Sequence, residues 1–236
     1  MTTMDRATQD RVVGLIQTGR ADAALLVLSR HVQDQPRDWY ALYLSGVASR
    51  SLGSLDQAIA FLAKSIAVRP TEASVHLALG IALQLDEQFD SAVDSLLAAI
   101  RLKPDLFEAY NSLGLTYKKQ GRYKHALETY EQGIERLMAS VSAVVHSDES
   151  RCYTEEIVDG KRIRTVLPYV LMKTREMLRS NPLYAIFTNN VGVCFEEIGQ
   201  LDEARVHFAE AVELTPDGYN YPDPLLNLLR LGRTNM

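Results

Sequence analysis

Apolar residues recur at helical spacing in paired segments along most of the chain. Residues 39–52 and 73–85 place apolar side chains at the three- and four-residue intervals that form one face of a helix. A break follows each stretch, with Gly53 in one copy and Gly19 and Gly121 in others. A second apolar stretch then runs through 55–68, 89–102 or 123–137. Because glycine suits a tight turn after a helix, the pattern predicts helical hairpins.

Three residue types recur at one constant interval along these hairpins. The interval, about 34 residues, is typical of helical repeat arrays. Each proline is expected to end a second helix, because it lacks a backbone donor and disfavours helix in the residue before it. Glycine inside a helix costs about 1 kcal/mol relative to alanine, so its recurrence predicts that neighbouring backbones approach too closely for a side chain. The marks are Pro36, Pro70 and Pro104; Ala24, Ala58, Ala92 and Ala126; and Gly46, Gly80 and Gly114.

Segment 109–137, AYNSLGLTYKKQGRYKHALETYEQGIERL, resembles the consensus of the tetratricopeptide repeat (TPR) family. Segments 76–104 and 189–216 carry the same marks in the same order. The resemblance implies an all-α fold, a right-handed superhelix of antiparallel helix pairs. We expect four repeats at 5–38, 39–72, 73–106 and 107–140, an insertion at 141–184, a fifth repeat at 185–218 and a C-terminal capping segment at 219–236. The marks in 109–137 are Tyr110, Leu113, Gly114, Tyr117, Gly121, Tyr123, Ala126 and Tyr130.

The insertion begins where Met138 replaces the expected proline, so the preceding helix is predicted to continue to Val145. Asp159-Gly160 lies between two alternating arms and predicts a β-hairpin. A helix is expected from Pro168 through Arg179. The segment's basic residues favour contact with an acidic partner, or else form a solvated face that pairs with nearby acids such as Glu155, Glu156 and Glu196. These residues are Lys161, Arg162, Arg164, Lys173, Arg175 and Arg179.

Composition and charge narrow the function. The 236 residues carry a net charge of −5, which argues against a nucleic-acid binder that relies on bulk positive charge. No apolar run approaches the roughly 20 residues of a membrane-spanning helix, and no secretory signal is evident, so we expect a cytoplasmic protein. The two cysteines and five histidines lack metal-ligand spacing, and no phosphate-binding glycine loop is present. We therefore expect no enzyme activity, no cofactor and no metal.

The resemblance implies that the first helices of the pairs line a concave groove. The paired lysines, asparagines and arginine with which some TPR proteins hold a carboxylate are absent, since Tyr43, Val47, Ala78, Glu108 and Ser112 occupy those places. Asn190 fits an asparagine ladder, but the other rungs do not. The middle of the groove is apolar enough to hold a helix or an apolar peptide, unless the insertion or the C-terminal segment fills it. The predicted peptide-binding residues are Tyr40, Tyr43, Val47, Arg50, Leu77, Ile81, Gln84, Asn111, Leu115, Lys118, Asn189 and Asn190.

Two functions stay open. The first is a scaffold or adaptor that binds a polypeptide segment in the groove, with the insertion helping to select it. The alternative is a structural protein that acts through homo-oligomerisation, in which the end repeats or the insertion pack against another copy.

Overall fold

The computed structural model describes residues 4–145, 153–158, 161–166, 168–216 and 218–233, with only the backbone for 145–171. The chain forms two compact units, Met1–Gly121 (unit 1) and Arg122–Met236 (unit 2). The division falls inside the fourth predicted repeat, 107–140.

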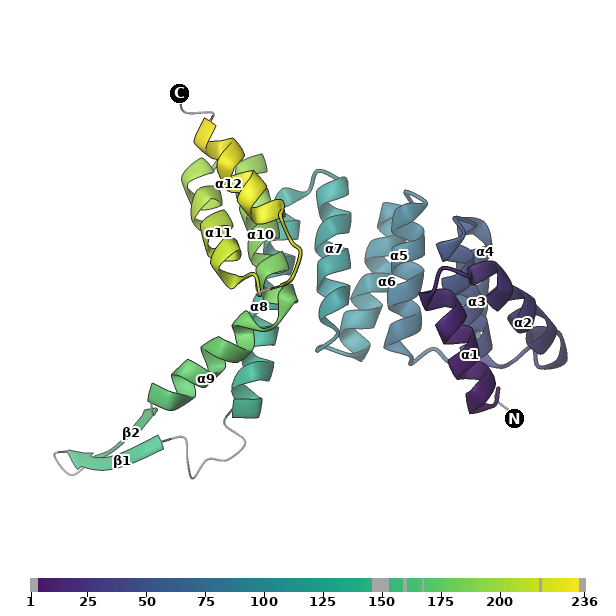
Figure 1. Cartoon of the computed structure of the whole chain (residues 1–236), viewed down its shortest axis with the longest axis horizontal. Helices are drawn as coiled ribbons and strands as arrows, with labels where there is room; N and C mark the ends of the chain where they lie inside the picture. The colour runs from purple at the N-terminus through teal and green to yellow at the C-terminus, as the bar shows by residue number, and fades with distance from the viewer. Residues whose placement is uncertain (1–3, 146–152, 159–160, 167, 217, 234–236) are drawn as a thin grey trace. The chain divides into compact units, whose positions relative to one another are not determined.

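Unit 1 is a series of helices joined by short turns (Figure 1). Consecutive helices pack together as hairpins, and the second helix of each pair also contacts the first helix of the next. Pro36, Pro70 and Pro104 each follow the last residue of a second helix, as expected for a residue that cannot continue one. The helices are α1 (Arg6–Gln17), α2 (Ala21–Asp34), α3 (Trp39–Ser51), α4 (Leu55–Val68), α5 (Ala73–Leu85), α6 (Phe89–Leu102) and α7 (Phe107–Lys119).

The recurring glycines lie at helix crossings. A Cβ on Gly46 would stand 2.5 Å from Leu62 Cγ, and one on Gly80 would stand 2.6 Å from Leu96 Cγ. Either distance is shorter than any ordinary carbon–carbon contact, so the leucine side chain or the helix that carries it would have to shift. The prediction that these positions exclude a side chain is confirmed for both glycines.

The turn after each first helix has its own requirement. Gly53 and Gly121 adopt φ of +75° and +72°, the left-handed region that glycine enters without strain. Glu87, at the equivalent position of the repeat between them, adopts φ of +59° without that freedom. The repeat geometry therefore imposes a left-handed residue here whatever the sequence supplies.

Asp38 ties the N-terminal end of unit 1 together. Its carboxylate accepts hydrogen bonds from Met4 N (2.8 Å), from His31 Nε2 (2.9 Å) and from the N–H groups of Tyr40 and Ala41 at the start of α3. Burial opposes the charged form, but these hydrogen bonds outweigh it and hold the pKa of Asp38 below its usual value.

Unit 2 holds the long helix α8 (Tyr123–Val145), α9 (Pro168–Arg179), α10 (Pro182–Glu197), α11 (Leu201–Leu214) and α12 (Asp223–Arg233). Strands β1 (Tyr153–Val158) and β2 (Lys161–Val166) pair antiparallel, from Tyr153 with Val166 to Val158 with Lys161. The predicted turn residues Asp159 and Gly160 lie outside the described residues. Helix α10 packs on both α8 and α11, and α12 packs on α11.

The core of unit 2 repeats the small-against-large packing of unit 1. Tyr130, Phe187 and Phe208 are fully buried, and the rings of Tyr130 and Phe187 lie 6.2 Å apart. A Cβ on Gly192 would stand 2.7 Å from the Phe208 ring, so this glycine marks the α10–α11 crossing as Gly80 marks the α5–α6 crossing.

Candidate functional site

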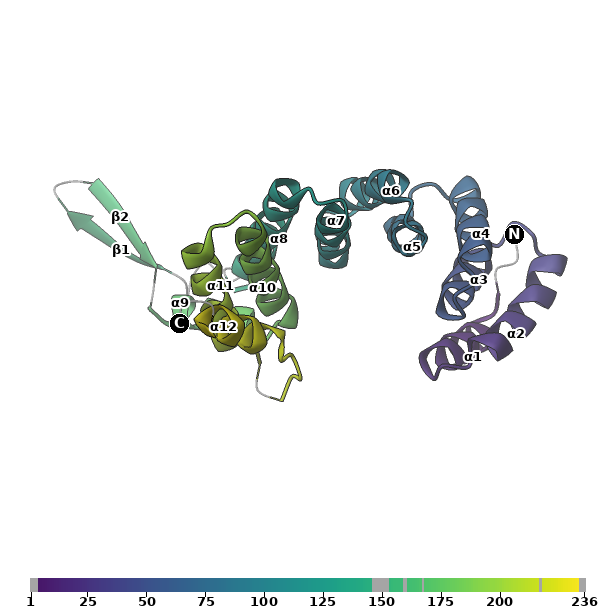
Figure 2. The same ribbon diagram turned by 90° about the horizontal axis from the view of Figure 1, so that it is seen from above.

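The first helices of the pairs form one row in unit 1. Helix α1 contacts α3, α3 contacts α5, and α5 contacts α7, while α4 and α6 lie on the other side (Figure 2). Tyr43, Val47 and Arg50 on α3 recur one repeat later as Leu77, Ile81 and Gln84, and two repeats later as Asn111, Leu115 and Lys118. The predicted residues of unit 1 therefore occupy equivalent positions on adjacent helices.

Five of these side chains form what we call the apolar band: Tyr43, Val47, Leu77, Ile81 and Leu115. Four are half-buried, and Leu115 is 38% exposed. Tyr43 packs against the cores on both sides of α3 and stacks on Tyr40, with ring centroids 5.9 Å apart. Burial, with a smaller contribution from Tyr40, raises the pKa of Tyr43, so its hydroxyl keeps its proton at neutral pH. The band offers apolar and aromatic surface with one hydroxyl donor.

Arg50, Gln84 and Lys118 follow the band at the C-terminal end of each first helix. Gln84 is buried, and its Nε2 donates to Ser112 O (2.9 Å) and Thr116 Oγ1 (2.6 Å) on α7. The Gln84 amide is thus engaged between α5 and α7.

Arg50 occupies the equivalent position one repeat earlier, but the residues opposite it on the next first helix are different. Ala78 and Ala82 occupy the positions of Ser112 and Thr116, so α5 presents no hydroxyl there. Arg50 Nε is buried and has no hydrogen-bond partner among the described residues. At this repeat position the Gln84 amide is therefore bonded between α5 and α7, whereas the Arg50 Nε has no partner among the described residues.

The corresponding face of unit 2 is covered by the chain's own C-terminal helix. Asn189 is buried, its Oδ1 accepts from Asn227 Nδ2 at 3.1 Å, and its amide also bonds to the Tyr221 hydroxyl. Burial, with the charge of Asp223, raises the pKa of Tyr221 to about 12. Arg230 pairs with both carboxylate oxygens of Glu196. The predicted residue Asn189 thus bonds to the C-terminal segment, while Asn190, its neighbour on α10, is half-buried.

Leu231 anchors α12 from the apolar side. It is 3% exposed and packs with Ala204 and Phe208 of α11. Leu225, Leu226 and Leu229, on the opposite side of α12, are 48%, 58% and 51% exposed. Helix α12 therefore closes the apolar end of the last hairpin and presents a second apolar face.

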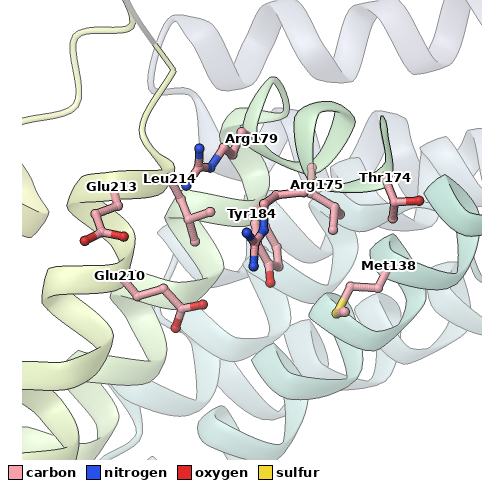
Figure 3. A pocket seen from close by; sticks show the side chains of 9 residues that line it. Met138, Thr174, Arg175, Arg179, Tyr184, Glu210, Glu213 and Leu214 are labelled. Carbon is pink, nitrogen blue, oxygen red and sulfur yellow. The ribbon is translucent and has the colours of Figure 1, made fainter. Parts of the chain in front are cut away.

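Part of the insertion lines a pocket of about 450 Å³ in unit 2, between α9 and α11, with Met138 of α8 and Tyr184 of α10 also in its wall (Figure 3). Arg175 and Arg179, one turn apart on α9, contribute basic groups, and Glu210 and Glu213 of α11 contribute acidic ones. No ion pair joins these arginines to these glutamates among the described side chains. Burial, and then Glu210, raise the pKa of Tyr184.

Of the other basic residues of the insertion, the structure describes the side chain of Lys173 only. Lys173 lies 3.3 Å from Glu176 in an exposed ion pair on α9. Lys161, Arg162 and Arg164 lie on β2, and their side chains are outside the described residues. Only Arg175 and Arg179 are therefore placed together, at the pocket.

The residues that the structure describes lack two further features. They contain no cluster of three or more His, Cys, Asp or Glu side chains arranged to hold a metal ion. In the described part of the chain, no helix combines the length and the apolar character needed to cross a membrane.

Comparison with protein families gives matches to repeat models. A model described as TPR repeat matches residues 87–121, and one described as tetratricopeptide repeat matches 107–136. A second tetratricopeptide repeat model matches 11–73 and 175–219. The matches flank the insertion, and the last one also covers its final residues, 175–184. No curated protein matches this sequence.

Solved structures with the same fold include crystal structures of MamA. One is 22% identical with a TM-score of 0.63, covering 90% of this chain and 96% of MamA. MamA from Desulfovibrio magneticus RS-1 is 20% identical with a TM-score of 0.58, covering 90% and 97%. A thermophilic TPR protein of Thermus thermophilus is 19% identical with a TM-score of 0.56, covering 98% of both chains. At these identities, the likeness concerns the fold.

Proposed function

Because this chain belongs to the tetratricopeptide repeat family, whose members typically serve as non-enzymatic interaction modules, we propose that it is a scaffold that binds a segment of another polypeptide. The bound segment lies along the apolar band of unit 1. The observation that carries the proposal is the band itself, five apolar or aromatic side chains at equivalent positions on α3, α5 and α7. Apolar side chains on the solvent-facing side of a helix row suit burial against a partner.

The size and chemistry of the band favour a peptide over a small molecule. Its residues come from three successive helices whose axes are about 8–10 Å apart in ordinary helix packing. A ligand that touches Tyr43, Ile81 and Leu115 together must therefore span about 20 Å, the length of two neighbouring spacings. An extended or helical segment does so.

Charge placed within the band tests this proposal. Leu77→Asp with Ile81→Asp puts two carboxylates where the segment would bury apolar side chains, and a buried unpaired charge is strongly unfavourable. We expect wild-type protein to enrich binders from a phage library of random 15-residue peptides, and the double variant to retain none of them. Far-UV circular dichroism should be unchanged, because both side chains are only half-buried and the helices keep their other core contacts.

The control places the same charges elsewhere. Leu26→Asp with Leu102→Asp changes two apolar residues that are 76% and 41% exposed on the second helices α2 and α6. Peptides enriched on wild-type protein should bind this variant with unchanged affinity. Binding that survives the change in the band, or that is lost equally in both variants, would exclude the band as the binding surface.

The insertion supplies a second contact in this proposal. The pocket beside α9 is lined by Arg175 and Arg179 and also by Glu210 and Glu213. Because no ion pair joins these arginines to these glutamates among the described side chains, the arginines suit an acidic side chain of the partner. Arg175→Glu with Arg179→Glu should weaken a partner that reaches this pocket and leave binding of short band peptides unchanged. Equal weakening of both ligands would argue against a separate contact.

Self-association is the second candidate function, and the exposed leucine face of α12 favours it. Leu226→Glu with Leu229→Glu should convert an associating protein to monomer in sedimentation velocity. Monomeric wild-type protein at tens of micromolar would remove this candidate.

A further inference from the structure

Arg50, whose buried Nε has no partner among the described residues, indicates the chemistry of the bound segment. We infer that the segment bound along the apolar band carries a carboxylate that pairs with Arg50, so that the partner is an acidic, apolar peptide rather than a purely apolar one. The inference rests on the proposed function and specifies its ligand.

The first argument is the internal comparison between repeats. At the equivalent position, Gln84 donates to the Ser112 carbonyl and the Thr116 hydroxyl. For Arg50 the equivalent positions are Ala78 and Ala82, which supply a backbone carbonyl but no hydroxyl, and its Nε is buried without a partner among the described residues. A buried donor without an acceptor costs about 1–3 kcal/mol, and more when the group is charged. The side chain as a whole is only half-buried, so an anionic group of a ligand can reach its exposed part and offset the charge that the protein leaves uncompensated.

The second argument is the charge of the surrounding face. The C-terminal end of the inner face of α3, α5 and α7 carries Arg50, Gln84 and Lys118, two cations and no acid, while the acid Glu108 lies at the opposite end, in the first turn of α7. The chain as a whole has a net charge of −5. The face is therefore a local reversal of the protein's charge, and it attracts a negative group.

The third argument is the surroundings of the guanidinium. Arg50 lies one turn beyond Val47 on α3, at the end of the apolar band, and its charge acts on the Tyr43 hydroxyl. A carboxylate there accepts from a guanidinium in a partly desolvated site, where charge-assisted hydrogen bonds are strongest. Tyr43 adds a neutral hydroxyl that can donate to the same group. A single cation beside apolar surface suits one carboxylate.

A specificity reversal tests the inference. Random 15-residue peptides selected on wild-type protein should be enriched in Asp or Glu together with apolar residues. Selection on Arg50→Glu should enrich Lys or Arg in place of the acids. Arg101→Glu, a charge reversal at an exposed arginine on α6, should leave the wild-type preference unchanged.

Affinity measurements on one selected peptide then assign the pair. Replacing its acid by the matching amide should weaken binding to wild-type protein about tenfold, the effect of about 1.4 kcal/mol. The same replacement should not change the affinity of the peptide for the Arg50→Gln variant. Glutamine is the residue found at the equivalent position 84, and it carries no charge. An anionic peptide selected equally well by Arg50→Gln would overturn the inference.

Failure of the proposed function gives a different result. Peptides that still bind the Leu77→Asp, Ile81→Asp variant would show that the band is not the site. Peptides that need the band but show no enrichment of acids would leave the proposed function standing and eliminate the role of Arg50. A phosphorylated peptide that binds wild-type protein but not Arg50→Gln, while its carboxylate analogue binds neither, would make the ligand a phosphopeptide and reject the carboxylate.

Discussion

The inner faces of the two units are built from the same repeat, but the face of unit 2 is bonded to the chain's C-terminal helix, α12. In unit 1 the equivalent positions on α3, α5 and α7 carry the apolar band and an arginine whose Nε has no partner among the described residues. In unit 2 the corresponding residues of α10 are bonded to α12, Asn189 to Asn227 and Glu196 to Arg230. The contrast shows how one framework supplies both a surface for a guest and a surface closed by the chain itself.

The spacing explains why α12 can close unit 2. Arg230 follows Glu196 by one full repeat length, and Asn227 follows Asn189 by one further helical turn. Helix α12 therefore takes the place that the first helix of a further repeat would occupy. Polar side chains on α10 are satisfied by that helix, whereas the side chains of the band are apolar and need a partner's apolar surface.

The largest effect is expected from breaking the closure of unit 2. Leu231→Ala removes a buried side chain between α12 and Phe208, and such truncations cost about 3 kcal/mol. Urea unfolding followed by far-UV circular dichroism should show this loss. Trp39, the single tryptophan, lies in α3, so its fluorescence should report an unchanged transition for unit 1.

The matched control for that change lies on the same helix. Leu229→Ala removes a leucine that is 51% exposed, and should alter the free energy of unfolding by about 0.5 kcal/mol or less. Equal losses in the two variants would show that α12 does not hold the end of unit 2 through Leu231.

A smaller effect is expected within unit 1, where the Gln84 amide is hydrogen-bonded and the Arg50 Nε one repeat earlier has no partner among the described residues. Thr116→Val keeps the shape of the side chain but removes the hydroxyl that accepts from Gln84 Nε2 at 2.6 Å. Position 116 on α7 then has no hydroxyl, like the equivalent Ala82 on α5. The same hydroxyl also donates to Ser112 O within α7, as the Thr18 hydroxyl does to Gly14 O in α1. The expected loss from the bond with Gln84 is about 1 kcal/mol, read from the fluorescence of Trp39 during unfolding.

Thr18→Val provides the comparison for Thr116. Its exposed hydroxyl bonds to Gly14 O, at the end of α1, and has no buried side chain depending on it. We expect a change of about 0.5 kcal/mol or less. A loss as large as that of Thr116→Val would mean that Gln84 gains nothing from the hydroxyl.

The smallest effect concerns the turn where the units differ. Gly199 in unit 2 has φ of +85°, while Glu87 in unit 1 holds φ of +59°. Glu87→Gly should stabilise unit 1 by about 0.5–1 kcal/mol, because relief of the left-handed strain exceeds the extra flexibility of glycine in the unfolded chain. Gly53→Glu should have the opposite sign by a similar amount. Calorimetric melting temperatures of both variants test the pair.

Much of the fold follows from the regularly spaced marks. Gly46, Gly80 and the prolines predict the hairpins because each records a steric requirement of its own position. The equivalent positions on α3, α5 and α7 follow from the same period, and so place the apolar band.

The partners of the polar residues were not predicted, because they depend on pairs of residues. Gln84 was expected to contact a peptide, yet its amide bonds to Ser112 and Thr116 on the next helix. A comparison of residues one repeat apart would have shown that the helix facing Gln84 offers the Thr116 hydroxyl, whereas the helix facing Arg50 has Ala82 at that position. The same comparison would have found the exception at Glu87 and the pairing of Arg230 with Glu196.

Helix α8 has a mechanical consequence for the insertion. It has 23 residues where α4 and α6 have 14, so it is about 35 Å long against about 21 Å. No proline interrupts it at Met138, and residues 141–145, the first of the insertion, therefore continue the same helix. A partner that contacts residues 141–145 therefore meets an already ordered helix, which loses little conformational freedom when contact is made.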